Sequence, residues 1–173
     1  MIERSIKDEH FIEAAHTIYP KEGQSVCGDT FVSKKVRGGT RIISVLSDGL
    51  GSGIKASVLS KLTTSMAVKF VSEDVDIEKA AVLIMETLPI CRVRQIAYST
   101  FTIVEMDLWG STRIVEYENP SCLLIRNGDV LPLETSTVTV HRDRKEPFNL
   151  KISTFQTKVG DRIVLVSDGV TQS

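Results

Sequence analysis

The sequence has few cysteines and no long apolar segment. Its three cysteines, Cys27, Cys91 and Cys122, are an odd number without a Cys-x-x-Cys spacing, which argues against a disulfide framework and a zinc site. The longest unbroken apolar run is 80–85, whereas a membrane-spanning helix needs about 20 such residues. The first ten residues are rich in charge, unlike the apolar centre of a secretion signal. We therefore expect a cytoplasmic protein with no membrane contact.

Net charge is also nearly absent. The chain has 21 Lys and Arg residues against 22 Asp and Glu residues, and neither sign gathers in a long block. Binding to nucleic acid or to an anionic lipid surface is therefore not expected. What the chain does have is 173 residues with 42% apolar side chains, which predicts a single globular domain spanning 1–173. The sequence gives no indication of an oligomeric state.

The first half of the chain is typical of a hairpin followed by helices. Strand-like segments at 30–36 and 41–47 flank the turn sequence Arg37-Gly38-Gly39-Thr40. A glycine-rich loop at 48–53 comes next. Apolar residues then recur every four positions and predict a helix, at Ile54, Val58, Leu62, Met66 and Phe70.

A second helix is predicted from Asp76, a suitable N-cap, to the region of Pro89. Its expected buried face is Ile77, Ala80, Ala81, Ile84 and Leu88. After it come short β-type segments at 98–106, 112–117, 123–126, 130–133, 137–141, 149–156 and 162–167. Strands, two helices and then antiparallel strands predict an α+β fold with helices packed on sheets.

An apolar strand ending in Ser-Asp-Gly occurs twice, at Asp48 and at Asp168. Each copy places a carboxylate where a buried strand ends, beside a glycine that permits close approach of the backbone. Asp-Gly after a strand is also a common hairpin signal, and this interpretation stays open for either copy alone. Asp48 departs from it, because a helix follows instead of a returning strand.

The predicted hairpin adds a third acid. A loop of two or four residues centred between Gly38 and Gly39 pairs residues whose numbers add up to 77, and Asp29 and Asp48 are such a pair. Their Cβ atoms would then be about 5 Å apart on one face. Like charges at that distance repel each other, so either a cation lies between them or the register differs.

Carboxylate and backbone carbonyl oxygens suit hard cations such as Mg²⁺ or Mn²⁺. Two such ions about 4 Å apart can lower the pKa of a bridging water for an in-line attack on phosphorus, which is phosphatase chemistry. His10, His16 and His141 are isolated from one another, and we assign them no role.

Four motifs in order resemble the bacterial SpoIIE-type branch of the metal-dependent PPM (type 2C) serine/threonine phosphatases. They are Cys-Gly-Asp-Thr-Phe at 27–31, Ser-Asp-Gly-Leu-Gly-Ser-Gly at 47–53 with Ala56, Thr-Phe at 100–101, and Gly-Asp at 160–161 followed by Ser-Asp-Gly-Val at 167–170. The resemblance implies an αββα four-layer sandwich with a two-metal site at one end of the sheets. It implies that Asp48 bridges both Mn²⁺ or Mg²⁺ ions, that the Gly49 carbonyl and Asp168 each ligate one, and that Asp29 contributes directly or through water.

Two departures from the family pattern qualify these expectations. Many relatives have Ala-Gly-His-Pro where this chain has Glu-Asn-Pro-Ser at 118–121, which puts a role of that loop in doubt. The family's final Asp-Asp, a further metal ligand, lies beyond the last Asp-Gly, whereas this sequence ends at Ser173. We therefore expect a C-terminally truncated domain without the final helix and closing strand, with weak activity and at most partial metal occupancy.

The resemblance predicts a hydrolase for phosphoserine or phosphothreonine on a bacterial signalling protein, for example an anti-sigma-factor antagonist. The alternative is a non-catalytic phosphatase-like module that binds a phosphorylated regulator.

Overall fold

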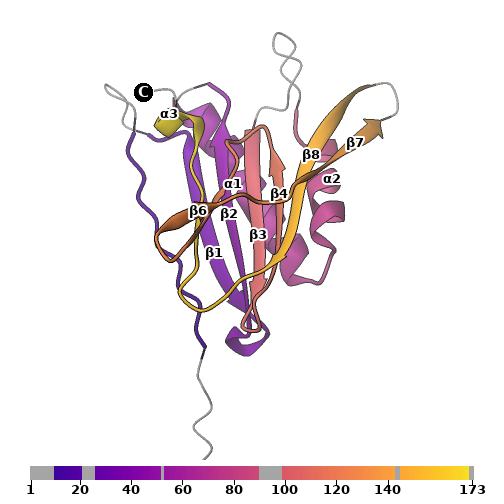
Figure 1. The fold of residues 1–173 in the computed structure, drawn as a ribbon. Coiled ribbons are helices and arrows are strands. Elements are labelled where there is room, and N and C mark those ends of the chain that lie inside the picture. Colours follow the sequence, from indigo (N-terminus) through magenta and orange to yellow (C-terminus); the bar gives the residue numbers. More distant parts are fainter. Residues whose placement is uncertain (1–9, 21–25, 52, 90–98, 143–144, 172–173) are drawn as a thin grey trace, which may run out of the picture.

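The computed structural model describes residues 10–20, 26–51, 53–89, 99–142 and 145–171. Its largest element is a six-stranded antiparallel sheet in the order β1-β2-β3-β4-β8-β7 (Figure 1). The strands of this sheet are β1 (Asp29–Val36), β2 (Arg41–Gly49), β3 (Ser99–Asp107), β4 (Ser111–Tyr117), β7 (Ser136–Arg142) and β8 (Lys145–Gln156). A single 3₁₀ turn, η1 (Arg37–Gly39), joins β1 to β2.

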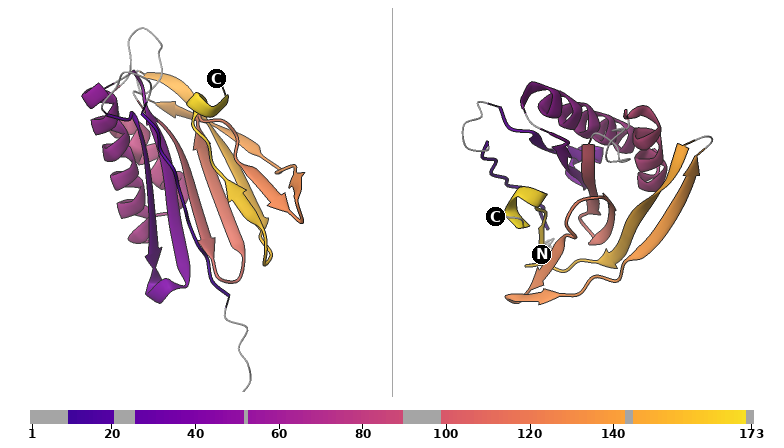
Figure 2. Two further views of the ribbon diagram at one scale, coloured as in Figure 1. Left: turned by 90° about the vertical axis from the view of Figure 1, so that its left-hand side faces the viewer. Right: turned by 90° about the horizontal axis from the view of Figure 1, so that it is seen from above.

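Two helices cover one face of this sheet, and a smaller sheet lies on the other side (Figure 2). The helices are α1 (Gly53–Ser72) and α2 (Ile77–Thr87). The small sheet has the order β6-β5-β9, with β5 (Leu123–Arg126), β6 (Asp129–Leu131) and β9 (Arg162–Val164). This α+β arrangement of helices, sheet and sheet confirms the predicted fold class. A helical layer on the outer side of the small sheet, the fourth layer of the expected sandwich, has no counterpart among the described residues.

The main core lies between the helices and the large sheet. Alternate residues of the strands point toward the helices, so Ile43, Val45 and Ile103 are fully buried against α1 and α2. The opposite face contributes a smaller cluster in which Val104 and Ile114 pack against Ile163 and other residues near the small sheet. The two faces of one sheet therefore serve different purposes: one stabilises the domain and the other faces the second sheet.

Helix α2 follows the prediction closely. The Asp76 side chain accepts hydrogen bonds from the backbone N–H groups of Glu78 and Lys79, which caps the helix at its first turn. Arg113 on β4 forms ion pairs with Asp76 at 2.7 Å and with Glu78 at 3.0 Å, so the cap is also fixed to the sheet. The predicted inner face is buried throughout, at Ile77, Ala80, Ala81, Ile84 and Leu88.

Helix α1 begins where predicted but turns a different face to the sheet. Ile54, Val58 and Leu62 are 74%, 57% and 44% exposed, so the apolar stripe that predicts the helix is not its inner face there. The buried residues are mostly small or carry a hydroxyl: Ala56, Ser57, Leu59, Ser60, Thr63, Thr64, Ala67, Val68 and Val71. Short side chains let the helix approach the strands closely, and Ser60 Oγ lies 2.8 Å from Thr30 Oγ1 on β1.

Several strand boundaries differ from the prediction, among them the start of β8, which is Lys145 and not 149, and the end of β9. Strand β9 is only Arg162–Val164, and a short helix, α3 (Asp168–Thr171), begins after residues 165–167, which lie outside a strand. Tyr98, expected to open β3, lies outside the described residues, as does Cys91. Helix α3 lies at the end of the sheets where β1 begins and β2 ends (Figures 1 and 2).

Candidate active site

Two carboxylates face each other at this end of the large sheet. Strands β1 and β2 pair with Asp29 directly opposite Asp48, the register predicted from the hairpin. Directly opposed residues of antiparallel strands point to the same face, so both carboxylates lie on the face away from the helices. They stand at the end of the hairpin farthest from the η1 turn.

Gly49 permits helix α1 to start close behind Asp48. A Cβ atom on Gly49 would lie 2.0 Å from the Ala56 carbonyl oxygen, so no larger residue fits without movement of the backbone. The Gly49 amide donates a hydrogen bond to the Gly28 carbonyl oxygen at 3.2 Å. A Cβ atom on Gly28 would lie 3.4 Å from the Gly49 carbonyl oxygen and 3.9 Å from Asp48 Oδ1, so these two oxygens border the same small space.

The second Ser-Asp-Gly copy approaches from the small sheet. No returning strand follows Asp168, because helix α3 starts there, and the hairpin interpretation is therefore wrong for this copy as well. Ser167 is 9% exposed, and its hydroxyl donates a hydrogen bond to Asp29 Oδ2 at 2.7 Å. The carboxylates of Asp29 and Asp168 both contact Asp48.

Burial and two like-charged neighbours change the titration of Asp48. Desolvation, the charge of Asp29 and hydrogen bonds with Asp29 and Asp168 together raise its pKa to about 8. A proton on Asp48 therefore offsets the repulsion among the three carboxylates near neutral pH. A divalent cation would offset the same repulsion more strongly, so the charge pattern fits a cation site.

A buried polar network supports the backbone of Asp48 from the β3 side. The Asp48 carbonyl oxygen accepts hydrogen bonds from Ser99 Oγ at 3.1 Å and from Thr100 Oγ1 at 3.4 Å. Asn119, which is 6% exposed, accepts a hydrogen bond from Thr100 Oγ1 and donates one to Thr102 Oγ1 at 3.1 Å. The loop that departs from the family pattern thus contributes one buried side chain to the wall behind the site.

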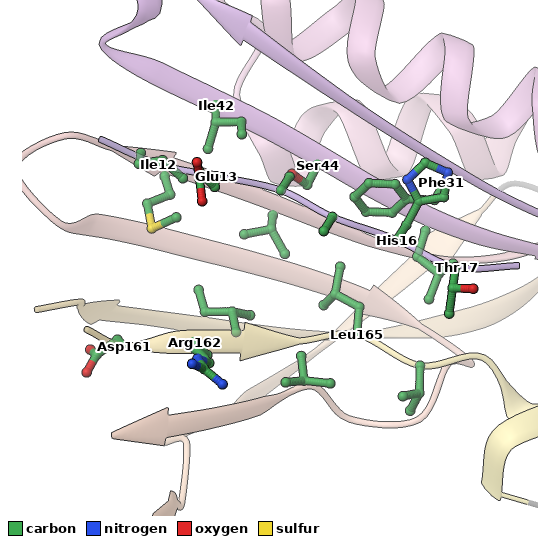
Figure 3. A pocket seen from close by; sticks show the side chains of 18 of the residues that line it. Ile12, Glu13, His16, Thr17, Phe31, Ile42, Ser44, Asp161, Arg162 and Leu165 are labelled. Atoms are coloured by element: carbon green, nitrogen blue, oxygen red, sulfur yellow. The ribbon is translucent and has the colours of Figure 1, made fainter. Parts of the chain in front are cut away.

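The site opens into a cavity of about 1520 Å³ between the two sheets and residues 10–19 of the N-terminal segment. Figure 3 shows Ile12, Ile42 and Leu165 on its walls and the His16 ring against Phe31, with ring centroids 4.9 Å apart. Asp29, Asp48 and Ser167 also line this cavity. The carboxylates are therefore accessible from the space between the sheets.

The predicted site residues thus come from three separate parts of the chain. Asp48 and Gly49 lie at the end of β2, Asp29 is opposite them on β1, and Asp168 starts α3. Within the described residues, no group of three or more His, Cys, Asp or Glu side chains is arranged as a cage for a metal ion. Asp48 therefore contacts each of the other two aspartates, but the three do not form a metal cage in this structure.

Asp161 of the Gly-Asp motif has a structural role. Asp161 accepts two hydrogen bonds from Arg126 at 2.8 and 2.7 Å and one from the Lys158 amide, which fixes the turn before β9. Burial raises the pKa of the Cys122 thiol, and Cys27 is only partly buried. The Cys27 thiol donates a hydrogen bond to the Tyr19 carbonyl oxygen at 3.7 Å.

Sequence reasoning missed Ser167 and Asn119. Ser167 stands inside the second Ser-Asp-Gly motif, in which only Asp168 has an expected role. Asn119 stands in the segment at 118–121, whose departure from the family pattern puts a role of that loop in doubt. Only the three-dimensional arrangement brings the first to Asp29 and the second to Thr100.

The arrangement of helices and sheets is that of PP2C-type phosphatase domains. The chain superposes with a TM-score of 0.72 on the PP2C phosphatase domain with a fragment of the regulatory domain of the cell fate determinant SpoIIE from Bacillus subtilis, at 22% identity over 88% of this chain and 44% of that one. RsbX in complex with magnesium superposes with a TM-score of 0.61, at 19% identity over 87% of this chain and 71% of that one. These likenesses define the fold.

The family follows from the sequence comparison. The family model of Stage II sporulation protein E (SpoIIE) matches residues 38–173, and the chain belongs to this family. Stage II sporulation protein E of Bacillus subtilis (strain 168) is 25% identical over 158 residues. That alignment covers 91% of this chain and 18% of the relative, so the chain spans about a fifth of the length of that protein. No described helix is long and apolar enough to span a membrane.

Proposed function

We propose that this chain is a Mn²⁺- or Mg²⁺-dependent phosphatase domain that hydrolyses phosphoserine or phosphothreonine on a regulatory protein. The observation that carries the proposal is the position of Asp48, whose carboxylate meets Asp29 and Asp168 and whose pKa is raised to about 8. Groups with strongly shifted pKa values in a cleft are candidates for functional sites. Membership of the SpoIIE family supports the same reaction class.

The donor set fits hard divalent ions. In the proposal, Asp48 and the Gly49 carbonyl would hold ions at the end of β2, Asp168 would hold one from the side of α3, and Asp29 would contribute directly or through water. The magnesium complex of RsbX supports a divalent cation. When bound, two such ions would acidify a water molecule and neutralise charge on the phosphoryl oxygens.

The residues of the chain position these groups for the reaction. Pairing of β1 with β2 fixes Asp29 against Asp48, and the hydroxyls of Ser99 and Thr100 hold the Asp48 backbone. The cavity between the sheets gives a phosphorylated side chain access to the aspartates. In this proposal water attacks phosphorus directly, so no phosphoenzyme would form. In this proposal residues 1–173 belong to one phosphatase-type domain.

The test is hydrolysis of p-nitrophenyl phosphate by the full chain in a Mn²⁺ and Mg²⁺ titration, with Asp48→Asn as the matched variant. The proposal predicts metal-stimulated hydrolysis that falls at least about 100-fold in Asp48→Asn, because the central ligand is lost. Exposed Asp129→Asn is the control and should retain activity.

One observation favours a second function. Since no group of three metal-ligating side chains forms a cage in the described residues, the fold could serve as a non-catalytic module that binds a phosphorylated regulator. An inert chain at saturating Mn²⁺ that still binds a phosphoserine peptide, measured by fluorescence anisotropy, would favour this module over the enzyme.

A further inference from the structure

The hydrogen bond from Ser167 to Asp29 joins the two sheets at the site. Asp29 is the first residue of β1 at the edge of the large sheet, whereas Ser167 follows β9 of the small sheet. The bond is 2.7 Å long and connects residues 138 positions apart. Both residues also line the cavity between the two sheets.

The two Ser-Asp-Gly copies use their serines differently. Ser47 is fully buried, and its hydroxyl lies 2.7 Å from the Thr100 carbonyl oxygen and 2.6 Å from Ser99 Oγ, away from the carboxylates. It lies within β2, where consecutive side chains point to opposite faces. Ser167 lies between β9 and α3, outside a strand, and the Val170 amide donates a hydrogen bond to its carbonyl oxygen. In this turn the side chains of Ser167 and Asp168 both reach the site.

On this basis we propose that Ser167 is a positioning residue for the divalent-cation site, an inference that rests on the proposed function. A serine hydroxyl has one proton, and donating it to Asp29 Oδ2 orients that carboxylate. Hydrogen bonds to an ionised carboxylate are stronger than neutral ones, so the bond holds Asp29 in one rotamer. Because Asp168 is the next residue, the same bond keeps Asp168 beside Asp48.

In this proposal the Ser167 hydroxyl orients Asp29 and Asp168, which would bind the cation, but is not a ligand itself. Outer-shell partners of this kind typically contribute 10- to 100-fold to metal affinity. Removing the Ser167 hydroxyl should therefore weaken metal binding without changing the number of ligands. A threonine at this position keeps a hydroxyl and should keep most of the affinity.

The experiment is isothermal titration calorimetry of the full chain with Mn²⁺ alone, supported by the Mn²⁺ electron paramagnetic resonance spectrum. Ser167→Ala should bind Mn²⁺ about 10-fold more weakly or worse, with a changed spectrum, and Ser167→Thr should restore both. Ser153→Ala is the matched control, because Ser153 is 3% exposed and bonds Thr135 Oγ1 at 2.9 Å elsewhere in the fold. It should bind Mn²⁺ as the unchanged chain does.

The outcomes separate the two proposals. If the unchanged chain binds Mn²⁺ and Ser167→Ala binds it equally well, the positioning role is wrong and the proposed function stands. If both Ser167→Ala and Ser153→Ala lose affinity in parallel with thermal stability, the effect is general and the positioning role is again overturned. If the unchanged chain binds no Mn²⁺, the cation site and the role of Ser167 are both overturned.

Discussion

Asp29 and Asp48 face each other as directly paired residues of β1 and β2, on the face of the sheet that looks into the cavity. Two like charges in such a position destabilise a folded chain unless a proton or a cation lies between them. Asp48 is the group that responds, with a pKa raised to about 8. Binding of a divalent cation would therefore reduce the repulsion between the Asp29 and Asp48 carboxylates.

The first prediction concerns the stability of the metal-free chain as pH changes. The pKa of Asp48 is raised in the folded state from the ordinary 3.8 to about 8, so the folded chain holds a proton that the unfolded chain releases. Between these values the folded state binds more protons, and stability falls as the pH rises. In EDTA, the melting temperature should therefore decrease from pH 5 to pH 8.

Asp48→Asn is the control for this prediction, because it removes the titrating group and keeps its shape. The variant should melt at a higher temperature than the unchanged chain at pH 8 in EDTA, and its melting temperature should depend less on pH. Mn²⁺ should raise the melting temperature of the unchanged chain at pH 8 and leave the variant unchanged. Equal pH dependence in the two proteins would contradict the raised pKa.

The second prediction concerns the contact between Gly49 and α1. Gly49→Ala should destabilise the chain by about 3 kcal/mol or more, because its Cβ atom would lie 2.0 Å from a backbone oxygen of Ala56. Backbone cannot move aside as a flexible side chain can. Gly169→Ala is the control, since nothing lies within 4 Å of its added Cβ atom. Urea unfolding of both variants measures the difference, and equal values would refute the close approach.

The third prediction tests the polar network behind Asp48. Asn119→Ala removes the hydrogen-bond partner of the buried Thr102 hydroxyl and of the partly buried Thr100 hydroxyl, and should cost about 1–3 kcal/mol of unfolding free energy. The control is Asn149→Ala, because Asn149 accepts a hydrogen bond from Thr139 at 2.8 Å on the exposed surface. That variant should lose less than about 0.5 kcal/mol. Similar losses in urea unfolding would show that the network contributes little.

Local sequence rules account well for the elements that depend on short-range signals. The turn at 37–40 fixes the register of the first hairpin, and thus the opposition of Asp29 and Asp48. The Asp76 cap and the apolar spacing after it define α2. In each case the residues that determine the element lie close together in the chain, so the local sequence is enough to predict it.

Features that depend on contacts between distant parts of the chain could not be predicted from local sequence patterns. Strand β9 ends early because the chain leaves the sheet to bring Ser167 to Asp29, a contact across 138 positions. The buried face of α1 depends on how near the helix can approach β1 and β2, which favours small and hydroxyl side chains over the larger apolar ones. Spacing predicts the Asp29–Asp48 pair, but only the family resemblance predicts that Asp168 joins it, because Asp168 follows β9 of the small sheet.

The last prediction tests the orientation of α1 with two neighbouring residues. Leu59 is 9% exposed and Val58 is 57% exposed, although both are apolar and one position apart. Leu59→Ala should cost about 2–4 kcal/mol through a cavity, whereas Val58→Ala should change stability by less than about 1 kcal/mol. Alanine favours a helix at both positions, so the difference reports burial. Urea unfolding with a larger loss for Val58→Ala would mean that the stripe of Ile54, Val58 and Leu62 faces the sheet after all.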